Sequence, residues 1–559
     1  MLDLAIKNAV VHDGSGRAPV PGSVGVENGR IAAVGNDVGQ AKRVIDADGL
    51  ALMPGIIDTH THYDAQITWD PFVNPSPALG VTTVVMGNCG FTIAPCRTGD
   101  RDLVMRNLTH VEGMSLDSLR SGIDWNFESF PQYLEAIERR GVGPNVACFV
   151  GHSSVRTFVM REDATQRAAT AQEVEQMRQL VVEGMRAGAC GFSTTRNSQH
   201  NGENGIPMPS RLADEQEMLA LSSALADVGK GVLMMTKDAL TTPISFIEQL
   251  AKSAQRPYLI AALLHSNLTP EATFDDLSEI AAAHRRGNRL YGAVSACPLT
   301  FEFTLHEPYV FEGLKSWQPL MKMDEPAQKR ELASPEFRAQ VKQELAKRAR
   351  RMFNGEWGKT YVTQAARPAH GHYDGGSVES LARAAGKHPL DFMLDLSLAE
   401  ELDTLFTSTL LNSDEEAVGR MMRDPNSIIS LSDAGAHLTF LCDAGFGLHL
   451  LGHWSRTLGV LSLPEAIRKI TSQAADLFGI VDRGRIAPGH CADLLLFDPA
   501  TVGRGKATRA FDLPAGASRL TTPALGLHGV WVNGQQVADA SGLVPQAPRA
   551  GQLLRSFAA

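Results

Sequence analysis

The stretch 54–64, with the sequence PGIIDTHTHYD, decides how the rest of the chain is interpreted. A short apolar run ends there in two histidines one residue apart, His60 and His62. Side chains alternate between the two faces of a strand, so both imidazoles lie on one face, about 7 Å apart along it. Neutral imidazole nitrogen is a good ligand for zinc and similar ions. The stretch therefore predicts a metal site at the end of a buried strand, with Asp64 two residues further on.

The composition is typical of a soluble globular protein, with 43% hydrophobic and 20% charged residues among 559. The net charge of −10 argues against a general nucleic-acid binder. Seven cysteines without a CxxC pair suit a reducing compartment. The first residues do not resemble a signal peptide, and no apolar run reaches the length of a membrane span. We expect a cytoplasmic protein with a small-molecule partner, no nucleic-acid or membrane partner, and homo-oligomerisation left open.

From residue 51 onward, apolar and β-branched runs alternate with helical patterns, which indicates α/β architecture with a parallel sheet. Eight such runs occur, at 51–58, 81–86, 145–150, 189–194, 231–236, 258–264, 290–296 and 427–432. Eight strand–helix units predict a (β/α)8 TIM-type barrel, in which the chemistry takes place at the carboxyl ends of the strands.

The two chain ends have a different rhythm. Residues 1–53 consist of short strand patterns separated by turns such as Asn28-Gly29, and β character returns after about residue 480. We expect 1–53 and 480–559 to form one small β-sandwich beside a barrel of 54–479. An insertion of about 300–425 separates the seventh and eighth strands of that barrel.

Polar side chains follow seven of the eight predicted strands. Because the strand ends of a barrel meet at one mouth, we expect these side chains to form one ring. The ring contains His60, His62, Cys89, His152, Arg196, Lys237, His265 and Asp433.

Histidines, a cysteine and a strand-eight aspartate suit hydrolysis by metal-activated water. Asp433, in the stretch 430–437 (SLSDAGAH), is the candidate general base that takes a proton from water and returns it to the leaving amine. The alternative is that Asp433 merely starts a turn before Ala434 and Gly435.

Three motifs together point to a known family. Residues 54–62 are similar to the strand-one signature of the amidohydrolase superfamily. Residues 80–90, GVTTVVMGNCG, resemble its D-aminoacylase (N-acyl-D-amino-acid deacylase) branch, in which a strand-two cysteine ligates the metal. Residues 482–494, DRGRIAPGHCADL, are similar to the return from the barrel to the sandwich. The resemblance implies a barrel plus sandwich, zinc, and hydrolysis of an N-acyl or related amide bond.

The resemblance also implies roles for individual residues. The metal ligands would be His60, His62, Cys89 and His265, and the catalytic aspartate Asp433 would contact one or two Zn²⁺ ions.

Strand five departs from the branch, because D-aminoacylases have a histidine where this chain has Lys237. Lys237 ligates a metal only if it is neutral or carboxylated. Otherwise it binds a substrate carboxylate or pairs with Asp238 or Asp433.

His152, Arg196 and His437 are candidates for substrate binding, with packing as the alternative role. His370 and His372, in the insertion, follow no apolar strand and predict a lid loop rather than a second metal pair.

The predicted function is metal-dependent hydrolysis of a C–N amide bond in an N-acyl amino acid or a similar small amide. The alternatives are a cyclic amide (hydantoinase-like), lactone or carbamate substrate, and a non-catalytic scaffold.

Overall fold

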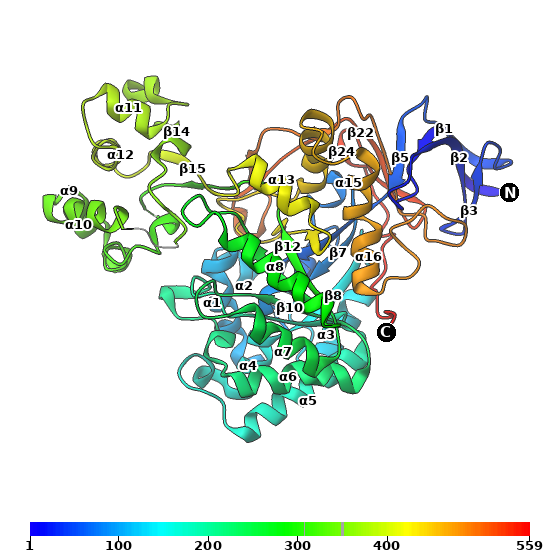
Figure 1. Cartoon of the computed structure of the whole chain (residues 1–559), viewed down its shortest axis with the longest axis horizontal. Coiled ribbons are helices and arrows are strands. Elements are labelled where there is room, and N and C mark those ends of the chain that lie inside the picture. Colours follow the sequence, from blue (N-terminus) through cyan, green and yellow to red (C-terminus); the bar gives the residue numbers. More distant parts are fainter. Residues whose placement is uncertain (307, 348–350) are drawn as a thin grey trace.

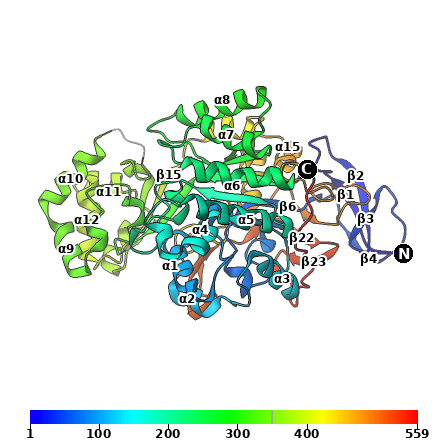
Figure 2. The ribbon, with the colours of Figure 1, turned by 90° about the horizontal axis from the view of Figure 1, so that it is seen from below.

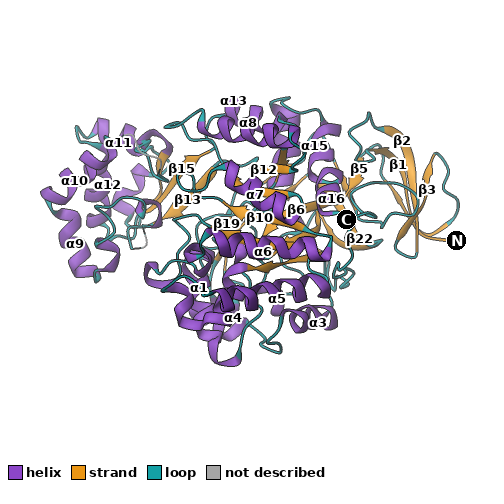
Figure 3. Cartoon of the chain, turned by 60° about the horizontal axis from the view of Figure 1, so that its bottom comes forward, coloured by secondary structure: helices purple, strands orange, loops and turns teal. Residues whose placement is uncertain are grey.

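The computed structural model describes residues 1–306, 308–347 and 351–559, and a barrel of eight parallel strands forms its centre. The order in the sheet is β16-β12-β11-β10-β9-β8-β7-β6. The strands are β6 (Ile56–Thr61), β7 (Val81–Met86), β8 (Asn145–Gly151), β9 (Gly191–Thr195), β10 (Val232–Thr236), β11 (Tyr258–Leu263), β12 (Leu290–Val294) and β16 (Ser427–Ile429). Figure 3 shows helices packed around the outside of these strands. The predicted (β/α)8 barrel is confirmed.

The first and last strands close the barrel at the point where the site lies. Thr61 pairs with Ala434 in a parallel bridge, and the His62 N–H donates to the Ala434 carbonyl at 2.8 Å. The Ser432 hydroxyl donates to the His60 carbonyl at 3.0 Å. These bonds hold the two histidines of β6 in register with the segment that follows β16.

The barrel helices lie in the connections between strands. Before β16 they are α1 (Arg101–Glu112), α2 (Leu116–Gly122), α3 (Phe130–Arg140), α4 (His152–Met160), α5 (Ala171–Ala187), α6 (Glu215–Val228), α7 (Ile244–Ala254), α8 (Ala272–Arg285) and α13 (Glu415–Arg423). After β16 come α14 (Phe446–His449), the π-helical η12 (Leu450–Thr457), α15 (Leu463–Ile470) and α16 (Ser472–Phe478). Among the described residues, no helix combines the length and the hydropathy needed to cross a membrane.

Strands from both chain ends join one nine-stranded sheet. They are β1 (Leu2–Val11), β2 (Val20–Glu27), β3 (Arg30–Gly35), β4 (Ala41–Asp46), β5 (Ala51–Pro54), β17 (Leu494–Phe497), β22 (Leu527–Val532), β23 (Gln535–Asp539) and β24 (Gly542–Leu543). The two ends meet where β5 pairs antiparallel with β17. Side chains from both ends, such as Ile6, Leu494 and Trp531, pack in one core.

The predicted run 51–58 is in fact two strands that belong to different sheets, and Gly55 separates them. Its N–H donates to the Asp493 carbonyl at 2.9 Å. A Cβ at this position would lie 2.1 Å from the Thr82 hydroxyl oxygen, so only glycine fits. The chain therefore passes from the terminal sheet directly into the strand that carries the two histidines.

The segment between β12 and α13 has its own core. It contains the three-stranded sheet β13-β15-β14, namely β13 (Leu299–Phe303), β15 (Leu405–Leu411) and β14 (Thr360–Gln364), and the helices α9 (Glu325–Ala333), α10 (Pro335–Leu345), α11 (Val378–Ala384) and α12 (Pro389–Ala399). Stacked aromatic rings such as Phe311 and Trp317, 4.3 Å apart, fill its interior. Figures 1 and 2 show these helices and the N-terminal strands at opposite ends of the molecule, with the barrel between them.

Candidate metal centre

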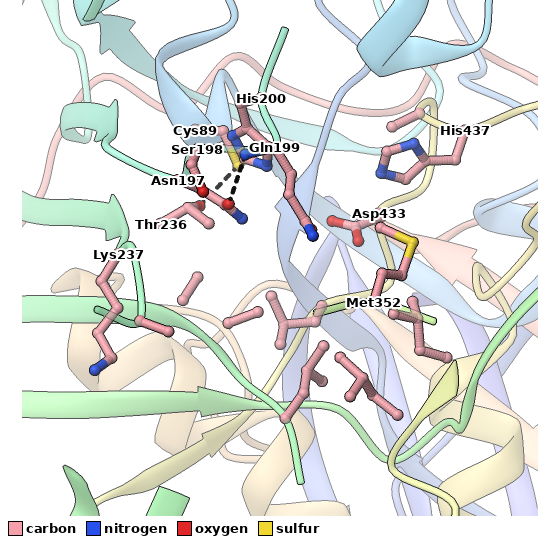
Figure 4. Close-up of a pocket in the computed structure, with 18 of the residues that line it drawn as sticks. Cys89, Asn197, Ser198, Gln199, His200, Thr236, Lys237, Met352, Asp433 and His437 are labelled. Atoms are coloured by element: carbon pink, nitrogen blue, oxygen red, sulfur yellow. Dashed lines mark hydrogen bonds between the residues drawn. The ribbon is translucent and has the colours of Figure 1, made fainter. Parts of the chain in front are cut away.

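A pocket of about 230 Å³ lies at the barrel mouth, and four potential metal ligands converge on it. His60 and His62 come from β6, Cys89 from the turn after β7, and Asp433 from the segment after β16. We call these four residues the donor cluster. Figure 4 shows Cys89 and Asp433 on opposite sides of one space, with His437 beside Asp433.

The ligand atoms of His60, His62 and Cys89 are close enough to share one ion, and Asp433 lies beside the two histidines. Cys89 Sγ lies 3.5 Å from His60 Nε2 and 4.0 Å from His62 Nε2. Asp433 Oδ1 lies 3.1 Å from His60 Nε2 and 3.6 Å from His62 Nε2. Among the described residues, His60, His62 and Cys89 form the one group of histidine, cysteine or acidic side chains whose ligand atoms lie within 4.8 Å of one another.

The backbone around the donor cluster adopts a conformation that most residues avoid. Cys89, Asp433 and His437 have φ values of 57°, 46° and 55°. Such a left-handed conformation costs about 1–3 kcal/mol for a residue other than glycine and occurs most often at functional sites. Gly435 follows Asp433 at φ 91°, where a Cβ would lie 2.7 Å from the His62 carbonyl oxygen. The strained backbone at Cys89 and Asp433 directs their thiol and carboxylate into the pocket.

The charges in the donor cluster balance one another. Burial favours the neutral form of each group, but the neighbouring charges outweigh it. The Cys89 and Asp433 anions raise the pKa of His60 to about 9, and the two histidines lower the pKa of Cys89 to about 7. The same histidines hold the pKa of Asp433 well below its usual range. One thiolate and one carboxylate therefore face two protonated imidazoles.

This donor set fits a divalent ion. Zinc is bound in proteins by imidazole nitrogen, thiolate sulfur and carboxylate oxygen, usually with four ligands in all. A divalent cation also matches the two negative charges of Cys89 and Asp433 once the imidazoles are neutral. His60, His62 and Cys89 would hold the ion, and Asp433 would lie beside it, within reach of a water in the fourth position.

Lys237 does not belong to the donor cluster. Side chains of β10 alternate, and Thr236 points inward, with its hydroxyl 3.1 Å from Cys89 Sγ. Lys237, the next residue, instead donates from Nζ to Asp276 Oδ1 of α8 at 2.8 Å. Figure 4 shows the lysine directed away from Cys89. The hypotheses of a carboxylated ligand and of a pair with Asp238 or Asp433 are not supported, because the ammonium already has a partner.

His265 is also separate from the donor cluster. β11 ends at Leu263, and the chain has turned by the time it reaches His265. Both backbone groups of His265 bond to Asn412, at 2.7 Å through the Asn412 side chain and at 2.9 Å through its N–H. The imidazole lies 6.3 Å from the Phe274 ring of α8. The pocket is lined here by Ala261, Ala262, Leu264 and Ser266 instead.

Of the three predicted substrate contacts, one lines the pocket. His437 does so, and burial lowers its pKa, which keeps its imidazole neutral. His152 is fully buried, and its ring nitrogens contact Thr194 Oγ1 at 2.8 Å and Glu217 Oε1 at 2.9 Å. The Arg196 guanidinium lies over the ring of Phe246, 5.6 Å from its centre. The alternative packing role applies to these last two residues.

The histidines of the insertion do not reach the pocket. His370 Nδ1 lies 2.9 Å from Glu400 Oε1, and His372 Nδ1 lies 3.1 Å from the Ala369 carbonyl. Both belong to the short helix η11 (Pro368–Tyr373) within the insertion. The lid-loop contact predicted for this pair is not seen.

Two pocket residues have no signal in the sequence. Glu112 is the last residue of α1, and its Oε1 lies 3.4 Å from His62 Nδ1. His200, in the loop after β9, contacts the Thr195 hydroxyl through Nδ1 at 2.8 Å. Neither follows a strand directly, so neither stands out as part of a ring of strand ends.

Apolar side chains also line part of the pocket, together with polar ones such as Lys237, Asp238 and Ser266. They come from the end of β11 and from the insertion, which contributes residues of β13 and of the end of β15. We call this surface the apolar wall; it consists of Ala261, Ala262, Leu264, Leu299, Phe301, Met352 and Leu411.

Comparison with known proteins gives a consistent result. Residues 43–538 match the model of the Amidohydrolase family. The chain is 28% identical over 566 residues to the D-aminoacylase of Alcaligenes xylosoxydans xylosoxydans, covering 100% of this chain and 98% of that protein. It is also 28% identical over 565 residues to an N-acyl-D-aspartate deacylase of the same organism, covering 99% and 95%. A solved structure from work on the binuclear metal centre of D-aminoacylase is 26% identical, with a TM-score of 0.67 and full coverage of both chains.

Proposed function

The chain belongs to the amidohydrolase family and is a metal-dependent hydrolase of C–N amide bonds, and we propose that it deacylates N-acyl-D-amino acids with apolar side chains. The observation that carries the proposal is the pocket itself, in which the donor cluster faces the apolar wall. The D configuration is taken from the relatives, which are a D-aminoacylase and an N-acyl-D-aspartate deacylase.

The apolar wall supports an apolar group in the substrate. Leu299, Phe301 and Leu411 of the insertion face the pocket together with Leu264. Burying a side chain of leucine or methionine size there contributes about 1.5–3 kcal/mol. The two described basic residues of the pocket already have partners, since Lys237 pairs with Asp276 and the Arg351 guanidinium donates to four backbone carbonyls.

We propose that the resident metal is a single Zn²⁺ ion. Two imidazoles, a thiolate and a carboxylate are typical zinc donors. The ends of β10 and β11 contribute Thr236, Lys237, Asp238, Ala261 and Ala262 to the pocket. Lys237 is paired with Asp276, and Asp238 accepts hydrogen bonds from the N–H groups of Leu240 and Thr241, so neither is free to hold a second zinc ion. A binuclear centre, as in D-aminoacylase, is therefore not expected in this chain.

The chemistry follows from the position of Asp433. A zinc ion held by the donor cluster would polarise the amide carbonyl and lower the pKa of water. The Asp433 carboxylate, with 23% of its side chain exposed, reaches the pocket and stays ionised at neutral pH. It takes a proton from the attacking water and delivers it to the leaving nitrogen as the C–N bond breaks. The products are a carboxylic acid and a free amino acid.

A substrate panel tests this function. We expect N-acetyl-D-leucine and N-acetyl-D-methionine to be hydrolysed with a kcat/KM at least about tenfold above that of N-acetyl-D-aspartate, because burying a charge against apolar side chains is unfavourable. The N-acetyl-L-amino acids and a cyclic hydantoin complete the panel. Preference for the acidic substrate would overturn the side-chain assignment, and turnover of the hydantoin alone would favour the cyclic-amide alternative.

A further inference from the structure

We infer that Glu112 is a positioning residue for the metal centre, which holds His62 so that its Nε2 faces the ion. The inference rests on the metal centre proposed above. It concerns a residue on a helix of the barrel wall that provides no ligand itself.

The geometry of the His62 ring carries the inference. Its Nε2 faces the donor cluster, 3.6 Å from Asp433 Oδ1 and 4.0 Å from Cys89 Sγ. Its Nδ1 lies 3.4 Å from Glu112 Oε1, an ion-pair distance, and makes no hydrogen bond with a described residue in this conformation. The two nitrogens lie on different sides of an imidazole, so a carboxylate at Nδ1 is directed away from an ion at Nε2. A carboxylate in this place keeps the proton on Nδ1 and leaves the Nε2 lone pair for the metal.

The burial of the Glu112 carboxylate is energetically unfavourable unless a nearby group compensates its charge. The residue is 3% exposed, and its Oε2 has no hydrogen-bond partner among the described residues. Burying an ionised carboxylate is costly unless it is paired. Its one close described charge partner is His62, so its burial is best explained by a histidine that must be oriented.

Backbone contacts fix the position of Glu112 beside the donor cluster. It is the last residue of α1, and Gly113 at φ 62° turns the chain directly after it. The Leu438 N–H donates to the Glu112 carbonyl at 3.2 Å, which ties the helix end to the segment that carries Asp433. Glu112 thus reaches His62 from a helix whose position is set by the strand-eight segment.

Glu400 offers a matched control elsewhere in the chain. It is also buried, at 1% exposure, and also contacts a histidine Nδ1, that of His370 at 2.9 Å. It lies in the insertion and does not line the pocket. The control variant E400Q therefore removes a buried carboxylate beside an imidazole without touching the metal centre.

The experiment measures Zn²⁺ affinity by competition with a chelator and the visible spectrum of the Co²⁺-loaded protein, for the wild type, E112A, E112Q and E400Q. Loss of such an outer contact typically lowers metal affinity by about 10–100-fold, and we expect this for E112A. E112Q should recover part of the loss, since its amide oxygen still accepts the Nδ1 proton. The Co²⁺ spectrum of E112A should shift, and E400Q should match the wild type in both readouts.

Each result decides one question. If E112A and E112Q both bind Zn²⁺ as the wild type does, with unchanged Co²⁺ spectra, Glu112 does not position His62. If E400Q lowers the affinity as much as E112A, the effect is one of general stability and the inference is wrong. If E112A does not fold, E112Q alone decides, with a loss of affinity and a spectral shift supporting the inference. A wild-type protein that binds no Zn²⁺ would instead overturn the proposed metal centre.

Discussion

The carboxyl ends of parallel strands form both halves of the barrel mouth, but the side chains on the two halves differ in chemistry. On one half, the ends of β6, β7 and β16 place the donor cluster within a few ångströms. On the other half, the ends of β10 and β11 place Thr236, Ala261 and Ala262 in the pocket. Lys237 also lines the pocket, but its ammonium pairs with Asp276 of α8, and His265 packs near Phe274 of the same helix. A polar residue after a strand therefore reaches the metal centre only if no other element of the barrel binds its side chain first.

If the ion depends on one half alone, substitutions there remove metal or chemistry, whereas substitutions at Lys237 and His265 leave the metal in place. The following four predictions run from the largest expected effect to the smallest.

Removing a ligand of the donor cluster should have the largest effect. We expect H60A to lose bound zinc and to show no measurable turnover, because His60 contacts both Cys89 and Asp433. Dialysis of the wild type against a chelator should do the same, with recovery when Zn²⁺ is added back. Metal analysis and turnover are measured on one preparation. Full turnover by metal-free wild-type protein would contradict the role of the donor cluster.

Replacing Asp433 by asparagine should separate chemistry from metal binding. The amide keeps the shape of the side chain but cannot take a proton, so we expect kcat to fall at least about 10²-fold, the scale of a general base. Bound metal and the thermal midpoint should change little, since His60, His62 and Cys89 remain. A near-normal kcat would show that Asp433 is not the general base, and His437 would then be the next candidate. Loss of metal together with activity would make Asp433 chiefly a ligand.

The pH dependence of metal affinity should report on the donor cluster. In the metal-free protein the pKa of His60 is raised to about 9 and that of Cys89 lowered to about 7. Metal requires the neutral imidazole and the thiolate, so protons compete with it below these values. Apparent Zn²⁺ affinity should therefore rise from pH 6 to pH 9 and level off above. Chelator competition at four pH values measures it, and a flat profile would show that no protons leave on binding.

The smallest effect on metal is expected on the other half of the mouth. K237M and H265Q should keep the zinc content of the wild type, since neither side chain contacts the donor cluster. K237M should lower the free energy of unfolding by about 1–3 kcal/mol, because it leaves the partly buried Asp276 carboxylate unpaired. Metal analysis and denaturant unfolding test both statements. Loss of zinc from K237M, with partial rescue by bicarbonate, would restore the carboxylated-lysine hypothesis.

Much of the fold follows from local patterns. Eight apolar runs at strand–helix spacing predict the barrel because a buried parallel strand must be apolar on both faces. The predicted boundaries agree closely for β7 (Val81–Met86) and β8 (Asn145–Gly151). The run 51–58 is wrong in one respect, because apolar residues of two sheets adjoin at Gly55 and the pattern has no break there.

The residues of the donor cluster could also be predicted from the sequence. His60 and His62 share a face because strand side chains alternate, a rule that acts between neighbours in the chain. Cys89 and Asp433 lie in the short segments that follow β7 and β16, so the closed barrel brings them to the same place. These residues could be found because their positions depend on local geometry plus one global fact, the parallel closure of the barrel.

Only the tertiary structure decided the rest of the site. Lys237 lines the pocket, but its ammonium is paired with Asp276, whose position depends on how α8 packs. Glu112 reaches His62 from the end of a helix fifty residues downstream, and the apolar wall comes from an insertion with its own core. These contacts join segments that are far apart in the sequence. Their positions depend on how whole helices and strands pack, which the local pattern of apolar residues does not reveal. Local patterns in the chain thus predict the barrel and the candidate ligands His60, His62 and Cys89, whereas the packing of whole elements sets which side chains contact them.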